Sequence, residues 1–149
     1  MNGFLTDLLE NKIIIASATA WLIAQTLKLI FSYFQEGFIN FKRLAQAGGM
    51  PSSHSAFVVS LSTGVGIVEG TSSTIFAVSL IFALIIMYDA AGVRRAAGKQ
   101  AEVLNRIVDE LFQGHRFHEE RLRELLGHTP IEVIVGALLG ILVALSIVR

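Results

Sequence analysis

Residues 74–91 read TIFAVSLIFALIIMYDAA, and this stretch decides the fold class because its only charged residue is Asp89. A helix that crosses a bilayer needs about 20 mostly apolar residues, with a range of about 17–25. Residues 13–34 and 131–148 meet this description, and residues 55–68 form a shorter stretch rich in glycine and serine. The sequence therefore predicts an all-α integral membrane helical bundle with about four transmembrane helices.

The composition also indicates lipid as the main solvent of this chain. Of its 149 residues 53% are hydrophobic and 16% are charged, whereas soluble domains have roughly 25% charged residues. The formal net charge is zero, which gives no argument for a nucleic-acid partner, and there are no cysteines for disulfide or thiolate chemistry. We expect one membrane-embedded domain over residues 1–149, with the lipid bilayer as its surroundings.

Lysine and arginine are distributed unevenly over the predicted loops. With four spans, residues 35–53 and 92–129 lie on one side, and both termini lie on the other with the short turn at residues 69–73. The first side carries most of the basic residues, whereas the second carries only Lys12 and Arg149. Because cytoplasmic loops are enriched in lysine and arginine, the first side is predicted to face the cytoplasm from a multi-pass position in the plasma (inner) membrane.

A polar segment separates the third and fourth predicted spans. Within it, residues 100–112 carry apolar side chains at helical spacing, which predicts a cytoplasmic amphipathic helix on the membrane surface or against the bundle. Residues 121–126 are expected to form a second short helix. His115 and His118 are three residues apart and have the spacing of a metal pair, but beside two glutamates a solvated face is the favoured interpretation.

The second span begins with a polar motif, since residues 48–55 read GGMPSSHS. Pro51 ends any preceding helix, and Ser52 or Ser53 can cap the next one. Free N–H groups at a helix start favour an anion, and His54 can exchange a proton near neutral pH. The motif therefore indicates either a phosphate site or a capped helix start with an interfacial histidine.

Charged residues also close the third span, where residues 89–99 read DAAGVRRAAGK. Charge at membrane depth is costly, so we expect Asp89 to pair with an arginine and to orient it. Arg95 and Lys99 are four residues apart and share one helical face, and arginine suits phosphate oxygens. Arg94, Arg95 and Lys99 are therefore either phosphate ligands or ordinary basic anchors at the end of a span.

A third motif opens the last span, where residues 127–132 read GHTPIE. Thr129 is a good N-cap, Pro130 suits the first helical position, and Glu132 completes a capping box. The capping box explains Glu132 but not His128. A carboxylate four residues later would fix the ring of His128, and a neutral imidazole held in this way can attack phosphorus.

Two more features lie inside the predicted spans. Lys28 is deep in the first span, where its side chain either snorkels to the interface or reaches a buried anion. Gly136 and Gly140 form a pattern of small residues that suits close helix packing. This face is a candidate surface for a homo-oligomer.

Taken together and in this order, residues 48–55, 87–100 and 126–133 resemble the divergent branch of the type 2 phosphatidic acid phosphatases, which are relatives of the vanadium haloperoxidases. The resemblance covers nearly the whole chain. It implies a membrane lipid phosphatase that hydrolyses a phosphomonoester or pyrophosphate head group through a phosphohistidine, with no metal and no cofactor. A cytoplasmic site favours phosphatidylglycerol phosphate, phosphatidic acid or a polyprenyl phosphate as the substrate.

The resemblance implies roles for individual residues. Pro51 to His54 is similar to the Pro-Ser-Gly-His of the family, with Ser53 in place of glycine, and His54 would protonate the leaving alcohol. His128 to Glu132 is similar to the family's His-x-x-x-Asp, with glutamate in place of aspartate. His128 would then be the nucleophile, and Glu132 would orient it.

The chain departs from the family pattern around the phosphate. No Arg-Pro pair precedes Pro51, and Leu122 stands where the pattern has arginine. The implied phosphate-binding residues are therefore Lys28, Ser52, Ser53, Arg94, Arg95 and Lys99. Two alternatives stay open: a phosphate-lipid binding or transport protein that keeps the pocket without turnover, and a purely structural bundle.

Overall fold

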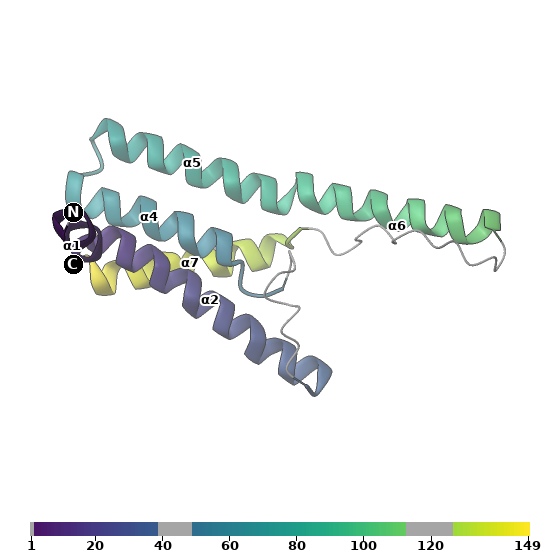
Figure 1. Cartoon of the computed structure of the whole chain (residues 1–149). Helices are drawn as coiled ribbons and strands as arrows, with labels where there is room; N and C mark the ends of the chain where they lie inside the picture. Colours follow the sequence, from purple (N-terminus) through teal and green to yellow (C-terminus); the bar gives the residue numbers. More distant parts are fainter. Residues whose placement is uncertain (1, 39–48, 113–126) are drawn as a thin grey trace.

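The computed structural model describes residues 2–38, 49–112 and 127–149, and these ranges contain helices and no strand (Figure 1). The helices are α1 (Asn2–Glu10), α2 (Lys12–Glu36), α4 (Ser53–Glu69), α5 (Thr74–Ala91), α6 (Val93–Phe112) and α7 (Pro130–Ile147). The prediction of an all-α fold is confirmed over these ranges. The predicted short helix at residues 121–126 and the histidine pair His115 and His118 lie outside the described residues.

All four predicted apolar stretches form helices, namely α2, α4, α5 and α7. Three segments are long and apolar enough to cross a membrane: Lys12–Phe34, Thr74–Val108 and Pro130–Ile147. The remaining helix, α4, has 17 residues and packs against α2, α5 and α7. The membrane-protein class is thus supported by three helices, and a fourth crossing by α4 stays a prediction.

Each bundle helix begins at a side-chain cap that the sequence supplies. Asn11 Oδ1 accepts from the N–H groups of Ile13 and Ile14 at 3.0 and 3.2 Å. Ser73 Oγ accepts from Phe76 N at 3.2 Å at the start of α5. Thr129 and Glu132 form the predicted capping box of α7. Of the two candidate serines for α4, the structure uses Ser52 as the cap.

The contact between α4 and α7 is the closest in the bundle, because glycine lets the two backbones approach each other. A Cβ atom on Gly136 would overlap the carbonyl oxygen of Ser52, and one on Gly140 would lie 2.5 Å from the carbonyl oxygen of Ala56. Both glycines are buried against α4 of the same chain. The prediction of a homo-oligomer through the Gly136/Gly140 face is therefore wrong, since this face is already filled.

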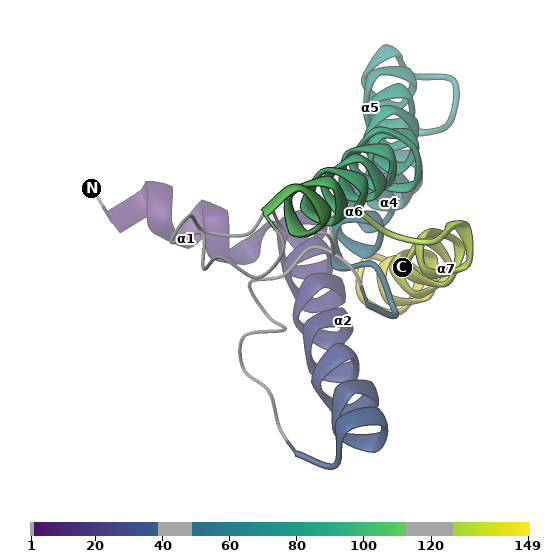
Figure 2. The ribbon, with the colours of Figure 1, turned by 90° about the vertical axis from the view of Figure 1, so that its right-hand side faces the viewer.

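The amphipathic helix predicted for residues 100–112 is confirmed but is longer, because α6 begins at Val93. It continues α5 beyond Gly92 and extends from the end of the bundle as an arm (Figures 1 and 2). Among the described helices α6 packs only against α5, so it is not docked on the bundle. Its apolar side chains, including Val103, Leu104 and Ile107, are exposed. A position on the membrane surface stays a prediction.

Polar motifs and chain termini lie at opposite ends of the bundle. The N- and C-termini lie at one end with the turn between α4 and α5 (Figure 1). The start of α4, the end of α5 and the start of α7 meet at the other end. This arrangement agrees with the predicted grouping of the loops, and it brings the three sequence motifs together.

The Gly136 contact supplies a direct test of the fold. Gly136→Ala should lower the free energy of unfolding by about 1–3 kcal/mol, because the new methyl group forces α7 away from α4. Thermal unfolding of the purified protein in detergent measures this change. Gly3→Ala is the matched control, since a Cβ at Gly3 would meet nothing within 4 Å. Equal unfolding temperatures for the two variants would contradict the close α4–α7 contact.

Candidate functional site

Backbone hydrogen bonds tie three helix ends into one site. The helix is interrupted at Gly92, so carbonyl groups near the end of α5 lose their usual helical partners. One of them, the Ala90 oxygen, accepts from His128 N at 2.9 Å. The N–H of Ser52 donates to the Glu132 oxygen in the first turn of α7 at 3.0 Å. These two bonds set the positions of the GGMPSSHS and GHTPIE motifs relative to α5.

His128 is held by the capping box of α7. Its side chain is 3% exposed, and Nδ1 lies 3.0 Å from Glu132 Oε2. The same carboxylate oxygen accepts from Thr129 N at 3.1 Å. Glu132 therefore caps the helix and orients the imidazole, so both interpretations of this residue hold. When Nδ1 donates to the carboxylate, a neutral imidazole carries its lone pair on Nε2.

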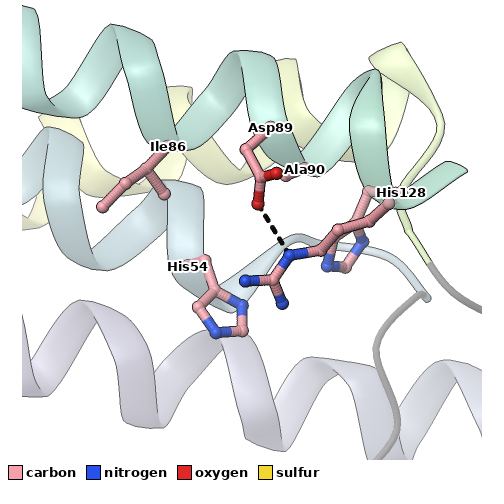
Figure 3. Close-up of a pocket in the computed structure, with 6 residues that line it drawn as sticks. His54, Ile86, Asp89, Ala90 and His128 are labelled. Atoms are coloured by element: carbon pink, nitrogen blue, oxygen red, sulfur yellow. Dashed lines mark hydrogen bonds and ion pairs between the residues drawn. The ribbon is translucent and has the colours of Figure 1, made fainter. Parts of the chain in front are cut away.

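A small pocket lies between the three helix ends and is lined by His54, Ile86, Asp89, Ala90, Arg94 and His128 (Figure 3). The two imidazoles reach it from different elements, His54 from the first turn of α4 and His128 from the segment before α7. A proton donor or acceptor and a candidate nucleophile thus share one pocket. Neither the spacing nor the order of these histidines in the chain would establish this proximity.

The predicted pairing of Asp89 with an arginine is confirmed, and the partner is Arg94. Asp89 Oδ2 lies 2.7 Å from Arg94 Nε, as the dashed line in Figure 3 shows. The two side chains are 38% and 48% exposed, so the pair adds little to stability. Its effect is positional, because it holds the guanidinium at the pocket through Nε and does not use the two terminal nitrogens.

Lys28 approaches the site from α2. It is only 4% exposed, so its ammonium group does not snorkel to an open surface. Its side chain packs against the loop before α4, with Cγ 3.3 Å from the place where a Cβ on Gly49 would be. Its charge acts on both His54 and His128. The burial of Lys28 argues against snorkelling, whereas its contact with an anion stays a prediction.

Of the six predicted phosphate ligands, only Arg94 is among the residues that line the pocket. Ser52 is fully buried, and its Oγ accepts from Ser55 N at 3.3 Å and from Ser55 Oγ at 3.0 Å, which makes it a structural cap. Ser53 is buried in the first turn of α4. Arg95 and Lys99 are exposed on α6. Of the three cations that follow the third span, the structure brings only Arg94 to the pocket.

Besides Ala90, two residues at the site were not expected from the sequence. Ile86 lines the pocket one turn before Asp89, and the three-residue spacing on α5 was the available signal. Gly127 has φ +105°, and a Cβ there would overlap the backbone of Arg95. Glycine at this position allows the chain before His128 to pass close to the start of α6. This contact joins segments far apart in the chain, so no local pattern could predict it.

Burial lowers the pKa of His128 below its ordinary value, because the charged imidazolium loses solvation, and the positive charge of Lys28 lowers it further. The hydrogen bond and charge of Glu132 and the backbone of Gly49 oppose this shift. The net result favours a neutral imidazole at pH 7. A neutral ring is the form that can act as a nucleophile.

This pKa shift predicts how stability depends on pH. Below about pH 6.5, His128 binds a proton more readily in the unfolded chain than in the folded chain. The free energy of unfolding therefore falls as the pH decreases. Between pH 7 and pH 5, the unfolding temperature of the wild type should fall more steeply than that of His128→Asn. Parallel curves for the two proteins would contradict the buried neutral imidazole.

Comparison with known proteins gives one family and one curated relative. The sequence profile described as the Divergent PAP2 family matches residues 9–143. The relative is the uncharacterized membrane protein YuiD of Bacillus subtilis (strain 168), which is 42% identical over 150 residues, or 93% of this chain and 95% of that protein. No solved structure shows significant similarity. The matched region includes every residue of the pocket.

Proposed function

The chain belongs to the divergent PAP2 family of membrane proteins, and on this premise we propose that it is a lipid phosphatase. It would hydrolyse a phosphomonoester or pyrophosphate head group, with His128 as the nucleophile and no metal. The observation that carries the proposal is the 3.0 Å contact of His128 Nδ1 with Glu132, in a pocket that His54 also lines. This arrangement supplies an oriented neutral imidazole and a second group for proton transfer.

The proposed reaction has two steps. In the first, His128 Nε2 attacks phosphorus, the bond from phosphorus to the leaving oxygen breaks, and His54 gives that oxygen a proton. In the second, His54 takes a proton from water, and the resulting hydroxide displaces phosphate from His128. Glu132 stabilises the positive charge on the imidazole during the attack. Arg94 and Lys28 are the cations that would offset the charge of the five-coordinate transition state.

The exposed side of α4 supports a lipid substrate over a soluble phosphoester. His54, Phe57 and Leu61 lie on one face of α4, and Phe57 is 41% exposed. This face lies between α2 and α5, which flank α4 without packing against each other in the described part of the chain (Figure 2). An acyl or prenyl chain lying there would place its head group at His54. Phosphatidylglycerol phosphate, phosphatidic acid and polyprenyl phosphates all have this form.

A second candidate function is a phosphate-lipid binding or transport protein without turnover. The observation that favours it is the small number of cations at the pocket, since Arg94 lines it while Arg95 and Lys99 do not. A phosphatase must stabilise more negative charge in its transition state than in its bound substrate. A binding protein needs only enough charge to hold the head group.

An assay of phosphate release separates these functions. The purified protein in detergent should release phosphate from at least one lipid phosphate of the three classes. His128→Ala and His54→Ala should each lower the rate by at least about 100-fold, because they remove the nucleophile and the proton donor. Ser146→Ala is the control, since Ser146 Oγ bonds only to Leu142 O of its own helix, at 2.8 Å.

Orthovanadate, which adopts the five-coordinate geometry of the transition state, provides a second measurement. It should raise the unfolding temperature of the wild type and of Ser146→Ala but not of His128→Ala. Equal phosphate release by the wild type and both histidine variants would overturn the catalytic proposal. Binding of lipid phosphate without release would favour the binding protein instead.

The proposed orientation places the pocket on the cytoplasmic side of the plasma membrane. Because the chain has no cysteines, single cysteines can report on each end of the bundle. Ser72→Cys lies in the exposed turn between α4 and α5, and Gln100→Cys is exposed on α6. In intact cells an impermeant maleimide should label the first and not the second. The reverse pattern would place the pocket on the outer face.

A further inference from the structure

A row of buried side chains, called the stripe here, runs along one face of α2 and changes from apolar to polar near the site. Ala16, Ala20 and Ala24 are fully buried, and Lys28 and Ser32 continue the stripe at the same four-residue spacing, at 4% and 6% exposure. Residues at this spacing share one face of a helix. The stripe is therefore apolar where α2 packs in the bundle and polar beyond Ala24, toward the end that carries the pocket.

The hydroxyl of Ser32 is buried and has no hydrogen-bond partner among the residues that the structure describes. In apolar helices, the hydroxyl groups of serine and threonine commonly donate a hydrogen bond to the carbonyl oxygen four residues earlier. Ser17, Thr26 and Ser146 do so, donating to Ile13, Leu22 and Leu142 at 2.8–2.9 Å. Ser32 does not donate to Lys28, which would be the corresponding partner. Its hydroxyl is thus left with an unused donor within the described part of the chain.

Ser60 is the other buried serine without a partner among the described residues, and its case has a packing explanation. The carbonyl to which it would donate belongs to Ala56. That oxygen lies against Gly140, at 2.5 Å from the place of a Cβ. The contact between α4 and α7 therefore occupies the space around the Ala56 oxygen. None of the described glycines lies against the Lys28 carbonyl in this way.

Ser32 lies one helical turn from a buried cation, Lys28. Lys28, one turn away on the same face, is close enough for its charge to act on both His54 and His128. A lysine ammonium and a serine hydroxyl are both donors, and together they suit an acceptor with several oxygens. We propose that Ser32 is a further phosphate ligand, whose Oγ–H donates to an oxygen of the phosphate that Lys28 binds. This inference rests on the proposed lipid phosphatase site.

Ser32→Ala tests the proposal against Ser60→Ala, a control that removes a hydroxyl equally buried and equally without a partner. Without ligand, both variants should unfold at or above the temperature of the wild type, because neither loses a hydrogen bond. Ser32→Ala should weaken binding of orthovanadate and of dioctanoyl phosphatidic acid by about 5- to 20-fold. Ser60→Ala and Ser32→Thr, which keeps the hydroxyl, should bind both ligands like the wild type.

The outcomes separate this inference from the proposed function. Weaker binding of both ligands by Ser32→Ala supports the phosphate ligand even if no variant releases phosphate. Unchanged binding overturns it even if the wild type is an active phosphatase. Weaker binding of the lipid alone overturns the assignment to phosphate, since Ser32 would then contact the glycerol ester. A wild type that binds neither ligand would overturn both the inference and the proposed site.

Discussion

The close approach of α4 and α7 across Gly136 and Gly140 is the constraint on which the rest of the structure depends. It allows the carbonyl of Ser52 to lie where a larger residue would place its Cβ. The N–H of Ser52 then reaches the carbonyl of Glu132. The starts of the two helices are thereby held side by side, and the histidines that precede or follow the two caps share a pocket. Without this approach, the motifs would be three unrelated helix ends.

Glu132 shows how a structural residue also serves the site. One carboxylate oxygen accepts from the backbone of Thr129 and contacts His128 Nδ1. The capping box fixes the carboxylate, the carboxylate fixes the ring, and burial keeps the ring neutral. Asp89 has a similar relation to Arg94, since an ion pair of small energetic value determines where the guanidinium lies. In both cases a carboxylate contributes to the site mainly by fixing the position of another side chain.

The prediction of helices succeeded where hydropathy and capping signals agreed. The apolar runs predicted the starts of α2, α4, α5 and α7 to within about two residues, and the predicted caps included Ser52 and Thr129. The pairing of Asp89 with an arginine followed from the cost of charge near lipid, but the choice of Arg94 did not, since three cations follow within ten residues. The break at Gly92 turns Arg95 and Lys99 away from the pocket, and no local pattern predicts that direction.

By itself, the sequence determined that this is a helical membrane protein, about where its four apolar helices begin, and which residues are candidates for chemistry, because hydropathy and capping are local properties of the chain. Only the tertiary structure decided that the glycine face of α7 packs on α4 rather than on a second copy, since the same small residues suit either contact. It also decided that Lys28 is buried beside the site, that Ser52 is occupied as a cap, and that Ser32 has no partner in residues 2–38, 49–112 and 127–149. Each of these depends on contacts between segments far apart in the chain, which a one-dimensional pattern does not contain.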